Sequence, residues 1–165
     1  TLPMAFYSKK VKSFAQAPKG ATVGIPNDPA MGGRALFLLE KGGVIKLRKG
    51  VGYTPSVLDI IENPKDLKFV ELEAAQLPIS LQDLDVACVP MNYAVSGGLD
   101  VNKQGFYFES RDAKYALIII AARPDNVQSP EVQTFVKCYQ SPEVAAFIKE
   151  KFKGQINPAW EQPAK

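Results

Sequence analysis

The sequence predicts an α/β fold with a mostly parallel sheet and flanking helices. Short apolar runs typical of strands alternate along the chain with segments whose apolar residues recur at helical spacing. Proline, asparagine and glycine separate these segments, as expected for turns. Such an alternation favours helices packed on a parallel sheet. A chain of 165 residues is long enough for one domain or a little more.

The expected strands are short runs of β-branched, aliphatic or aromatic residues. They are residues 3–8, 21–25, 68–72, 86–89, 106–108 and 115–122. The last run gives the clearest strand signal, because four aliphatic residues follow one another from Leu117 to Ile120. An uninterrupted apolar run indicates a strand that is buried on both faces.

The expected helices carry start and stop signals. Asp28 is a candidate N-cap for a helix over 29–41, Pro29 suits the first helical position, and Gly42-Gly43 ends it. Ser129-Pro130-Glu131 and Ser141-Pro142-Glu143 repeat one start signal, so two further helices follow them, and a surface tail covers 155–165. Shorter helical segments are predicted over 54–61, 77–84 and 92–97.

The composition excludes several classes of function. The net charge of +3 is spread in small groups, which is typical of a solvated surface and not of a nucleic-acid interface. No apolar run is long enough to span a membrane. The chain has no histidine, which removes the usual general base and metal ligand, and it carries no enzyme motif. We therefore expect neither an enzyme nor a bound metal or cofactor.

The two cysteines, Cys88 and Cys138, lie in apolar segments fifty residues apart. Their spacing matches no metal site. Two buried free thiols are expected, while a disulfide would need both side chains on facing surfaces.

The turn before the helix over 29–41 is the strongest candidate site. Arg34 lies near the helix N-terminus, where free backbone N–H groups and the helix dipole also favour an anion. A guanidinium there suits a small carboxylate or phosphate. Gly32 and Gly33 allow either a ligand or another backbone to approach closely. The alternative for Arg34 is a surface salt bridge.

A second candidate turn follows the strand over 86–89 and contains Asn92 and Tyr93. The carboxyl ends of parallel strands meet at one edge of a sheet, where ligands commonly bind. This turn and the Arg34 turn would together form a small-molecule cleft.

Four segments give the sequence a resemblance to a known family. They are Leu2-Pro3-Met4-Ala5-Phe6-Tyr7-Ser8-Lys9-Lys10, Ile25-Pro26-Asn27-Asp28-Pro29, Gly33-Arg34-Ala35-Leu36 and Val70-Glu71-Leu72-Glu73-Ala74-Ala75-Gln76-Leu77-Pro78. In this order they resemble the NlpA-type lipoproteins, which are the methionine-binding lipoproteins of bacterial ABC importers. The resemblance extends from Pro3 to about residue 154.

The resemblance implies a two-lobed fold like that of type II periplasmic binding proteins, which close on a ligand by hinge motion. Residues 9–112 would form a complete second lobe. Residues 1–8 and 113–165 would supply crossover strands and C-terminal helices of an incomplete first lobe. Apolar faces left uncovered would then favour a homodimer or a domain swap.

The resemblance also implies ligand-binding residues. Arg34 matches the family's carboxylate-binding arginine, whereas Met31 and Leu117 stand where the family has amide side chains. In the tetrad Pro90-Met91-Asn92-Tyr93 the asparagine is displaced by two places from the family pattern. Asn92 either reaches the ligand or is a helix-cap or turn asparagine, and Met31 either lines the cleft or makes ordinary packing contacts. The candidates are Arg34, Met31, Asn92, Tyr93 and Leu117.

The function that follows from the resemblance is binding of an amino acid of the D/L-methionine type for an ABC importer. The partners would be the importer's permease and ATPase subunits. The protein would face the periplasm, anchored to the bacterial envelope by a lipid-modified cysteine. The lost amides favour an alternative, a diverged envelope lipoprotein with another small anionic ligand or none.

Overall fold

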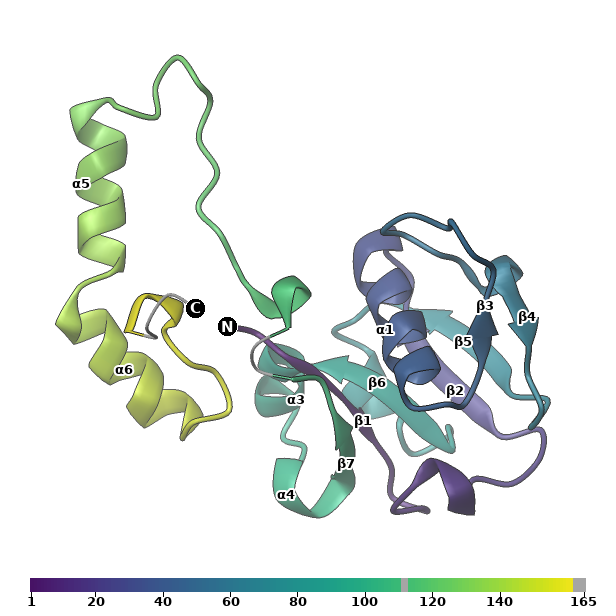
Figure 1. Cartoon of the computed structure of the whole chain (residues 1–165). Coiled ribbons are helices and arrows are strands. Elements are labelled where there is room, and N and C mark those ends of the chain that lie inside the picture. Colours follow the sequence, from purple (N-terminus) through teal and green to yellow (C-terminus); the bar gives the residue numbers. More distant parts are fainter. Residues whose placement is uncertain (111–112, 162–165) are drawn as a thin grey trace. The chain divides into compact units, whose positions relative to one another are not determined.

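A five-stranded sheet organises the larger of two units in this computed structural model, which describes residues 1–110 and 113–161 (Figure 1). The larger unit spans Met4–Glu109, and the smaller unit comprises Thr1–Pro3 and Ser110–Lys165. The strands are β1 (Met4–Tyr7), β2 (Thr22–Pro26), β5 (Lys68–Leu72), β6 (Val86–Pro90) and β7 (Gly105–Phe108). All five lie within expected strand runs or extend them by one residue at an end.

The sheet is mixed, with the strand order β5-β2-β6-β1-β7. β2 runs parallel to β5 and β6, whereas β1 runs antiparallel to both β6 and β7. The expectation of a mostly parallel sheet therefore holds for one half only. Alternation of strands and helices along the sequence does not specify which strands become neighbours, and β1 and β7 pair antiparallel although most of the unit lies between them in the sequence.

Helix α1 (Pro29–Lys41) has the bounds that its start and stop signals predict. The Asp28 carboxylate accepts a hydrogen bond from the backbone N–H of Met31 at 2.9 Å, and Gly42 is the C-cap. α2 (Leu77–Ser80) is shorter than predicted, and α3 (Met91–Ser96) and α4 (Val101–Gln104) complete the helices of this unit. None of the helices in the described part of the chain is long and apolar enough to cross a bilayer.

The predicted helix over 54–61 is wrong. A single turn, η2 (Val57–Asp59), leads into β4 (Ile60–Glu62), which pairs antiparallel with β3 (Lys46–Leu47). Ser56 and Asp59 form a capping box, whose side chains accept hydrogen bonds from backbone N–H groups of a single helical turn. The β-branched residues that follow then extend along a neighbouring strand, because cross-strand pairing outweighs weak helix propensity.

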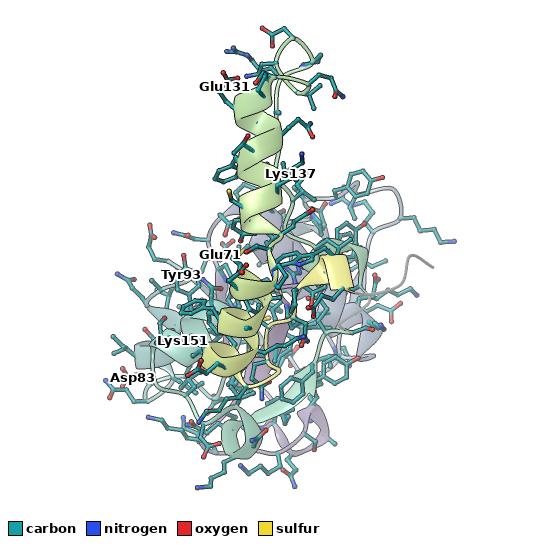
Figure 2. The ribbon with its side chains drawn as sticks, turned by 90° about the vertical axis from the view of Figure 1, so that its left-hand side faces the viewer. Glu71, Asp83, Tyr93, Glu131, Lys137 and Lys151 are labelled. Atoms are coloured by element: carbon teal, nitrogen blue, oxygen red, sulfur yellow. The ribbon has the colours of Figure 1, made fainter. Side chains whose placement is uncertain are left out.

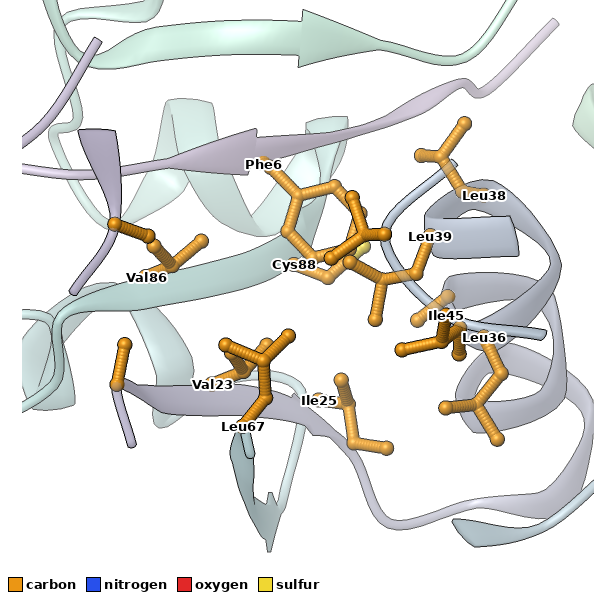
Figure 3. Packing of buried hydrophobic residues seen from close by; sticks show 14 of the residues in the cluster. Phe6, Val23, Ile25, Leu36, Leu38, Leu39, Ile45, Leu67, Val86 and Cys88 are labelled. Carbon is orange, nitrogen blue, oxygen red and sulfur yellow. The ribbon is translucent and has the colours of Figure 1, made fainter. Parts of the chain in front are cut away.

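The core of the larger unit lies between the sheet and α1. Leu36 and Leu39 of α1 pack toward Phe6, Val23 and Ile25 of the sheet, and all five side chains are fully buried (Figure 3). Burial of each such side chain contributes roughly 1.5–3 kcal/mol relative to its exposure. The packing therefore fixes α1 on the sheet and, with it, the residues on its first turns.

The two glycines of α1 serve backbone packing. A Cβ at Gly32 would lie 2.6 Å from the carbonyl oxygen of Pro26, and one at Gly33 would lie 2.8 Å from Cδ of Pro55 and 3.0 Å from the backbone Cα of Thr54. Another backbone therefore fills the space at these positions. Of the two expected causes of a close approach at these glycines, a ligand or another backbone, the structure shows the backbone.

Two helices dominate the smaller unit. They are α5 (Pro130–Tyr139) and α6 (Pro142–Phe152), capped as predicted by Ser129 and Ser141. Glu131 lies in the first turn of α5 and Lys137 in its last, which complements the helix dipole (Figure 2). Short turns η3 (Lys114–Ala116) and η4 (Ala159–Glu161) complete this unit.

The predicted strand over 115–122 does not form. Its residues enter η3 and then continue without regular structure, and Leu117 and Ile119 are 47% and 77% exposed. Strand propensity alone does not hold an extended segment, since its stability comes from a paired neighbour. In the part of the chain that the structure describes, no strand pairs with this run.

The expectation of two buried free thiols is correct for one of the two cysteines. Both thiols are free, but only Cys88 is buried, whereas Cys138 is exposed. Cys138 lies on α5, a helix with no buried residue, so its apolar sequence neighbours do not cover it.

Candidate ligand-binding site

One edge of the large sheet collects the ends of several strands. The parallel strands β2, β5 and β6 end there, and β1 begins there, since Met4 pairs with Pro90. Helix α1 follows β2 from this edge, and α3 follows β6. The two turns that the sequence singles out therefore do lie at the carboxyl ends of neighbouring parallel strands.

Arg34 lies in the second turn of α1 and is only 9% exposed. Its Nε donates to the Glu109 carboxylate, at 2.8 Å from Oε1 and 3.0 Å from Oε2. Its Nη2 also donates to Oε2 of Glu109. Two guanidinium nitrogens thus bind one carboxylate, in an ion pair between residues 75 positions apart in the sequence. A salt bridge, the alternative role expected for Arg34, is therefore present, although it is buried and not at the surface.

Glu109 follows β7 and is held by the first residue of β1. Its Oε2 accepts the backbone N–H of Met4 at 3.1 Å, and its own N–H donates to the Met4 carbonyl oxygen at 2.9 Å. Glu109 is 9% exposed, like its partner. Backbone contacts and the ion pair together fix the position of the carboxylate and of the guanidinium.

The ion pair lies near a fully buried thiol. Burial raises the pKa of Cys88 well above its ordinary value, the negative charge of Glu109 raises it further, and the positive charge of Arg34 opposes the rise. The Sγ atom of Cys88 lies 3.9 Å from Sδ of Met4. The surroundings of the ion pair are thus poorly solvated, and a buried charge is costly in such surroundings unless it is paired.

Met31 is half-buried and packs against the hydrophobic core from the first turn of α1. Packing in the core, one of its two expected roles, is thus present. Its proposed contact with a ligand stays a prediction.

Asn92 and Tyr93 lie in the first turn of α3. The N-cap position of this helix belongs to Pro90, so Asn92 does not cap it. The Asn92 side-chain oxygen Oδ1 is buried and has no hydrogen-bond partner among the described residues. Tyr93 is half-buried at the surface of this unit (Figure 2). An unpaired buried acceptor is uncommon, so Oδ1 of Asn92 is a candidate to accept from a ligand.

Leu117 lies in the smaller unit, directly after η3. The structure therefore brings Arg34, Met31, Asn92 and Tyr93 into one unit and leaves Leu117 outside it. The smaller unit has a hollow of its own, about 500 Å³, lined by Ile120, Arg123, Glu131 and Phe135 among others.

Glu109 is the residue that sequence reasoning missed. No local motif marks it, since it is one carboxylate after an aromatic strand. The only signal was indirect, because an arginine on the apolar side of a buried helix requires a counter-charge. Within the described residues, no cluster of three acidic or cysteine side chains could hold a metal ion.

Comparison with known proteins matches nearly the whole chain. The profile of the NlpA lipoprotein family covers residues 1–160. The D-methionine-binding lipoprotein MetQ of Escherichia coli K12 is 46% identical over 160 residues, and Lipoprotein 28 of the same strain is 45% identical. Each match covers 96% of this chain. The chain spans 59% and 58% of these two relatives, so both extend well beyond it.

A solved structure gives the same result. A nutrient-binding protein from Burkholderia cenocepacia, bound to methionine, superposes with a TM-score of 0.89 at 46% identity. The superposition covers 96% of this chain and 67% of that protein. MetQ and the protein from Burkholderia cenocepacia are named as binding proteins, and Lipoprotein 28 is named as a lipoprotein.

Proposed function

Because the chain belongs to the NlpA lipoprotein family, we propose that it binds an amino acid of the methionine type for a bacterial ABC importer. The observation that carries the proposal is the buried, fixed guanidinium of Arg34 at the sheet edge where parallel strands end. Relatives named for D-methionine binding and a relative bound to methionine support the ligand class.

The proposed roles follow from the chemistry of each side chain. Arg34 would hold the ligand carboxylate, since a planar fork of five N–H donors can serve more than one carboxylate. The unpaired Oδ1 of Asn92 would accept from the ligand ammonium group. Met31, Tyr93 and Leu117 would give apolar contacts to the side chain of the ligand.

The domain assignment is part of this proposal. Residues 9–112 would form the second lobe of a two-lobed binding protein, and 1–8 with 113–165 would belong to the first. The family fold implies that ligand binds between such lobes. The chain spans only 59% of its relative from Escherichia coli. The sequence match alone therefore does not assign the activity of a whole binding protein to this chain, and that activity is part of the proposal.

Partners and location are proposed on the same basis. A lipoprotein of an importer would face the periplasm, anchored to the bacterial envelope by lipid, and would deliver ligand to permease and ATPase subunits. The exposed apolar segment from Leu117 to Ile120 favours self-association of this chain as a homodimer or a domain swap.

A second candidate function is a diverged member of the family with another small anionic ligand or none. The observation that favours it is the apolar character of Met31 and Leu117. A site that has lost amide groups loses hydrogen bonds that discriminate strongly between ligands.

Calorimetric titration of the chain with L- and D-methionine tests the proposal. Arg34→Lys keeps the buried charge but loses the fork, so affinity should fall about tenfold or more, or about 1.4 kcal/mol. Arg48→Lys is the matched control, since Arg48 is a 61% exposed side chain of the same unit. Equal affinity of Arg34→Lys and wild type would place the carboxylate elsewhere, and no binding of methionine by wild type would favour the diverged alternative.

A further inference from the structure

In the connection between β1 and β2, three main-chain carbonyl groups converge on one lysine side chain. We propose that these carbonyl groups form a binding site for a monovalent cation of the ammonium type, and that the protein's own Lys65 side chain occupies it. A free alkylammonium ion should then bind there when this side chain is shortened. The inference goes beyond the proposed function, and its test does not depend on ligand binding at Arg34.

The Lys65 ammonium group donates to the three carbonyl oxygens at ordinary hydrogen-bond lengths. Its Nζ lies 2.8 Å from the oxygen of Phe14, 2.8 Å from that of Ala15 and 2.7 Å from that of Ala17. A lysine ammonium has three N–H donors and no acceptor, so these contacts use its whole donor capacity. Main-chain carbonyl groups that converge on one point replace the hydration shell of a monovalent cation.

The local backbone explains why these carbonyl groups accept from a cation. Phe14 and Ala15 lie in η1 (Phe14–Gln16), a single 3-10 turn, and Ala17 is its C-cap with an extended backbone before Pro18. The carbonyl end of a helical turn lacks partners within the turn and carries the negative end of its dipole. The Phe14 oxygen also accepts the N–H of Ala17 at 3.2 Å. Lysine side chains commonly bind such terminal carbonyl groups.

Backbone contacts hold the loop that carries Lys65, separately from its ammonium group. The carbonyl oxygen of Lys65 accepts the N–H of Gly20 at 2.7 Å. The Asn63 side chain bonds Leu67 twice, since Nδ2 donates to the Leu67 oxygen at 3.0 Å and Oδ1 accepts the Leu67 N–H at 2.9 Å. These contacts do not use Nζ, so the loop should keep its place when the side chain is shortened.

The turn that Lys65 binds is also connected to the core. The ring of Phe14 packs edge-on against Phe6 of β1 and Phe106 of β7, with centroids 5.1 Å and 5.0 Å apart. The residue whose carbonyl oxygen accepts from Lys65 therefore contacts two strands of the sheet. Occupation of the cation site should accordingly change the stability of the larger unit, which makes unfolding a suitable readout.

The test removes the attached cation and supplies a free one. Lys65→Ala deletes the side chain beyond Cβ, and n-propylammonium carries the atoms that are lost. Urea unfolding, followed by circular dichroism, compares the variant in n-propylammonium chloride and in tetramethylammonium chloride, an equally charged cation without N–H donors. Lys65→Ala should raise the unfolding equilibrium constant about tenfold or more, because hydrogen bonds to a charged group are lost. Only n-propylammonium should reverse most of that change.

Two control variants distinguish the cation site from general weakening of the fold. Lys65→Met keeps an unbranched side chain in the space but has neither charge nor donor, so it should be destabilised and should not respond to n-propylammonium. Lys19→Ala removes a lysine of the same connection, whose side chain is 75% exposed and paired with Asp66. Exposed pairs contribute little, so this variant should unfold like wild type in both salts.

Each outcome decides for or against the cation site. Recovery of Lys65→Ala by n-propylammonium alone, absent from wild type and from Lys65→Met, supports the site. Equal effects of the two salts on Lys65→Ala overturn it, as does equal recovery of Lys65→Met or a Lys65→Ala variant as stable as wild type. If Lys65→Ala does not fold in ordinary buffer, folding only in n-propylammonium supports the site, and folding in both salts or in neither overturns it.

Discussion

At the scale of single residues, burial decides which ionisable groups matter. Arg34 and Glu109 are buried and paired, whereas most other ion pairs, such as that of Lys46 with Glu62, are exposed. Exposed pairs contribute little to stability, and a broken buried pair is costly. The consequences of substitution should therefore concentrate at a few positions of the larger unit.

Two buried groups predict how stability depends on pH. Burial raises the pKa of Tyr7 and the pKa of Cys88, and charge repulsion between the two raises that of Tyr7 further. The folded protein then keeps protons that the unfolded chain releases above about pH 8.5 and pH 10. The contribution of these two groups to the free energy of unfolding should be constant below about pH 8. It should fall as the pH rises above that value.

Urea unfolding between pH 7 and pH 11 measures this slope. Tyr7→Phe should reduce the slope above about pH 10, because it removes one of the two titrating groups. Tyr53→Phe, at a tyrosine that is 72% exposed, should leave the slope unchanged. An equal slope in wild type and Tyr7→Phe would contradict the assignment to Tyr7.

At the scale of elements, close backbone packing holds α1 against the end of β2. The contact depends on Gly32, at which a Cβ would meet the carbonyl oxygen of Pro26 at 2.6 Å. That oxygen belongs to the backbone, so a substitution requires α1 or β2 to shift. The position of α1, which carries Arg34, therefore depends on Gly32 having no side chain.

Gly32→Ala should therefore destabilise the protein by roughly 1–3 kcal/mol, as overpacking does. Helix propensity alone would stabilise it by about 1 kcal/mol, so the sign separates the two effects. Chemical denaturation measures the difference, with Lys41→Ala as an exposed control on the same helix. Stabilisation by Gly32→Ala would show that the contact has room to relax.

At the scale of the whole molecule, an apolar segment is exposed. Leu117, Ile118, Ile119 and Ile120 are 47%, 60%, 77% and 38% exposed, and Phe135 on α5 is 56% exposed. Contiguous exposed apolar residues usually mark an interaction surface. An extended β-branched run also invites pairing with a strand of another chain.

Sedimentation velocity over a range of concentrations should show association of wild type. Ile119→Lys should weaken it, because a charge in an apolar interface must be desolvated. Leu58→Lys, at a leucine of the larger unit that is 83% exposed, is the matched control and should associate like wild type. A wild type that stays monomeric at all concentrations would contradict self-association through this segment.

The sequence by itself determined the elements that local interactions specify. The bounds of α1 and the caps of α5 and α6 follow from Pro, Ser, Asp and Gly at defined positions, and β5 follows from the alternating pattern of residues 68–72. Such signals act within a few residues, so they are readable without a fold. The same kind of local signal, Asp28 and Pro29 directly after a strand, also predicted that Arg34 lies near the end of that strand.

Only the tertiary structure decided what depends on distant partners. The antiparallel β1 and β7, the pairing of Arg34 with Glu109 and the exposure of residues 117–120 all required the fold. Residues 115–122 carry a strong strand propensity, yet they form no strand, because propensity is expressed only beside a paired neighbour. Pairing between residues far apart in sequence is set by packing, and no local pattern encodes it.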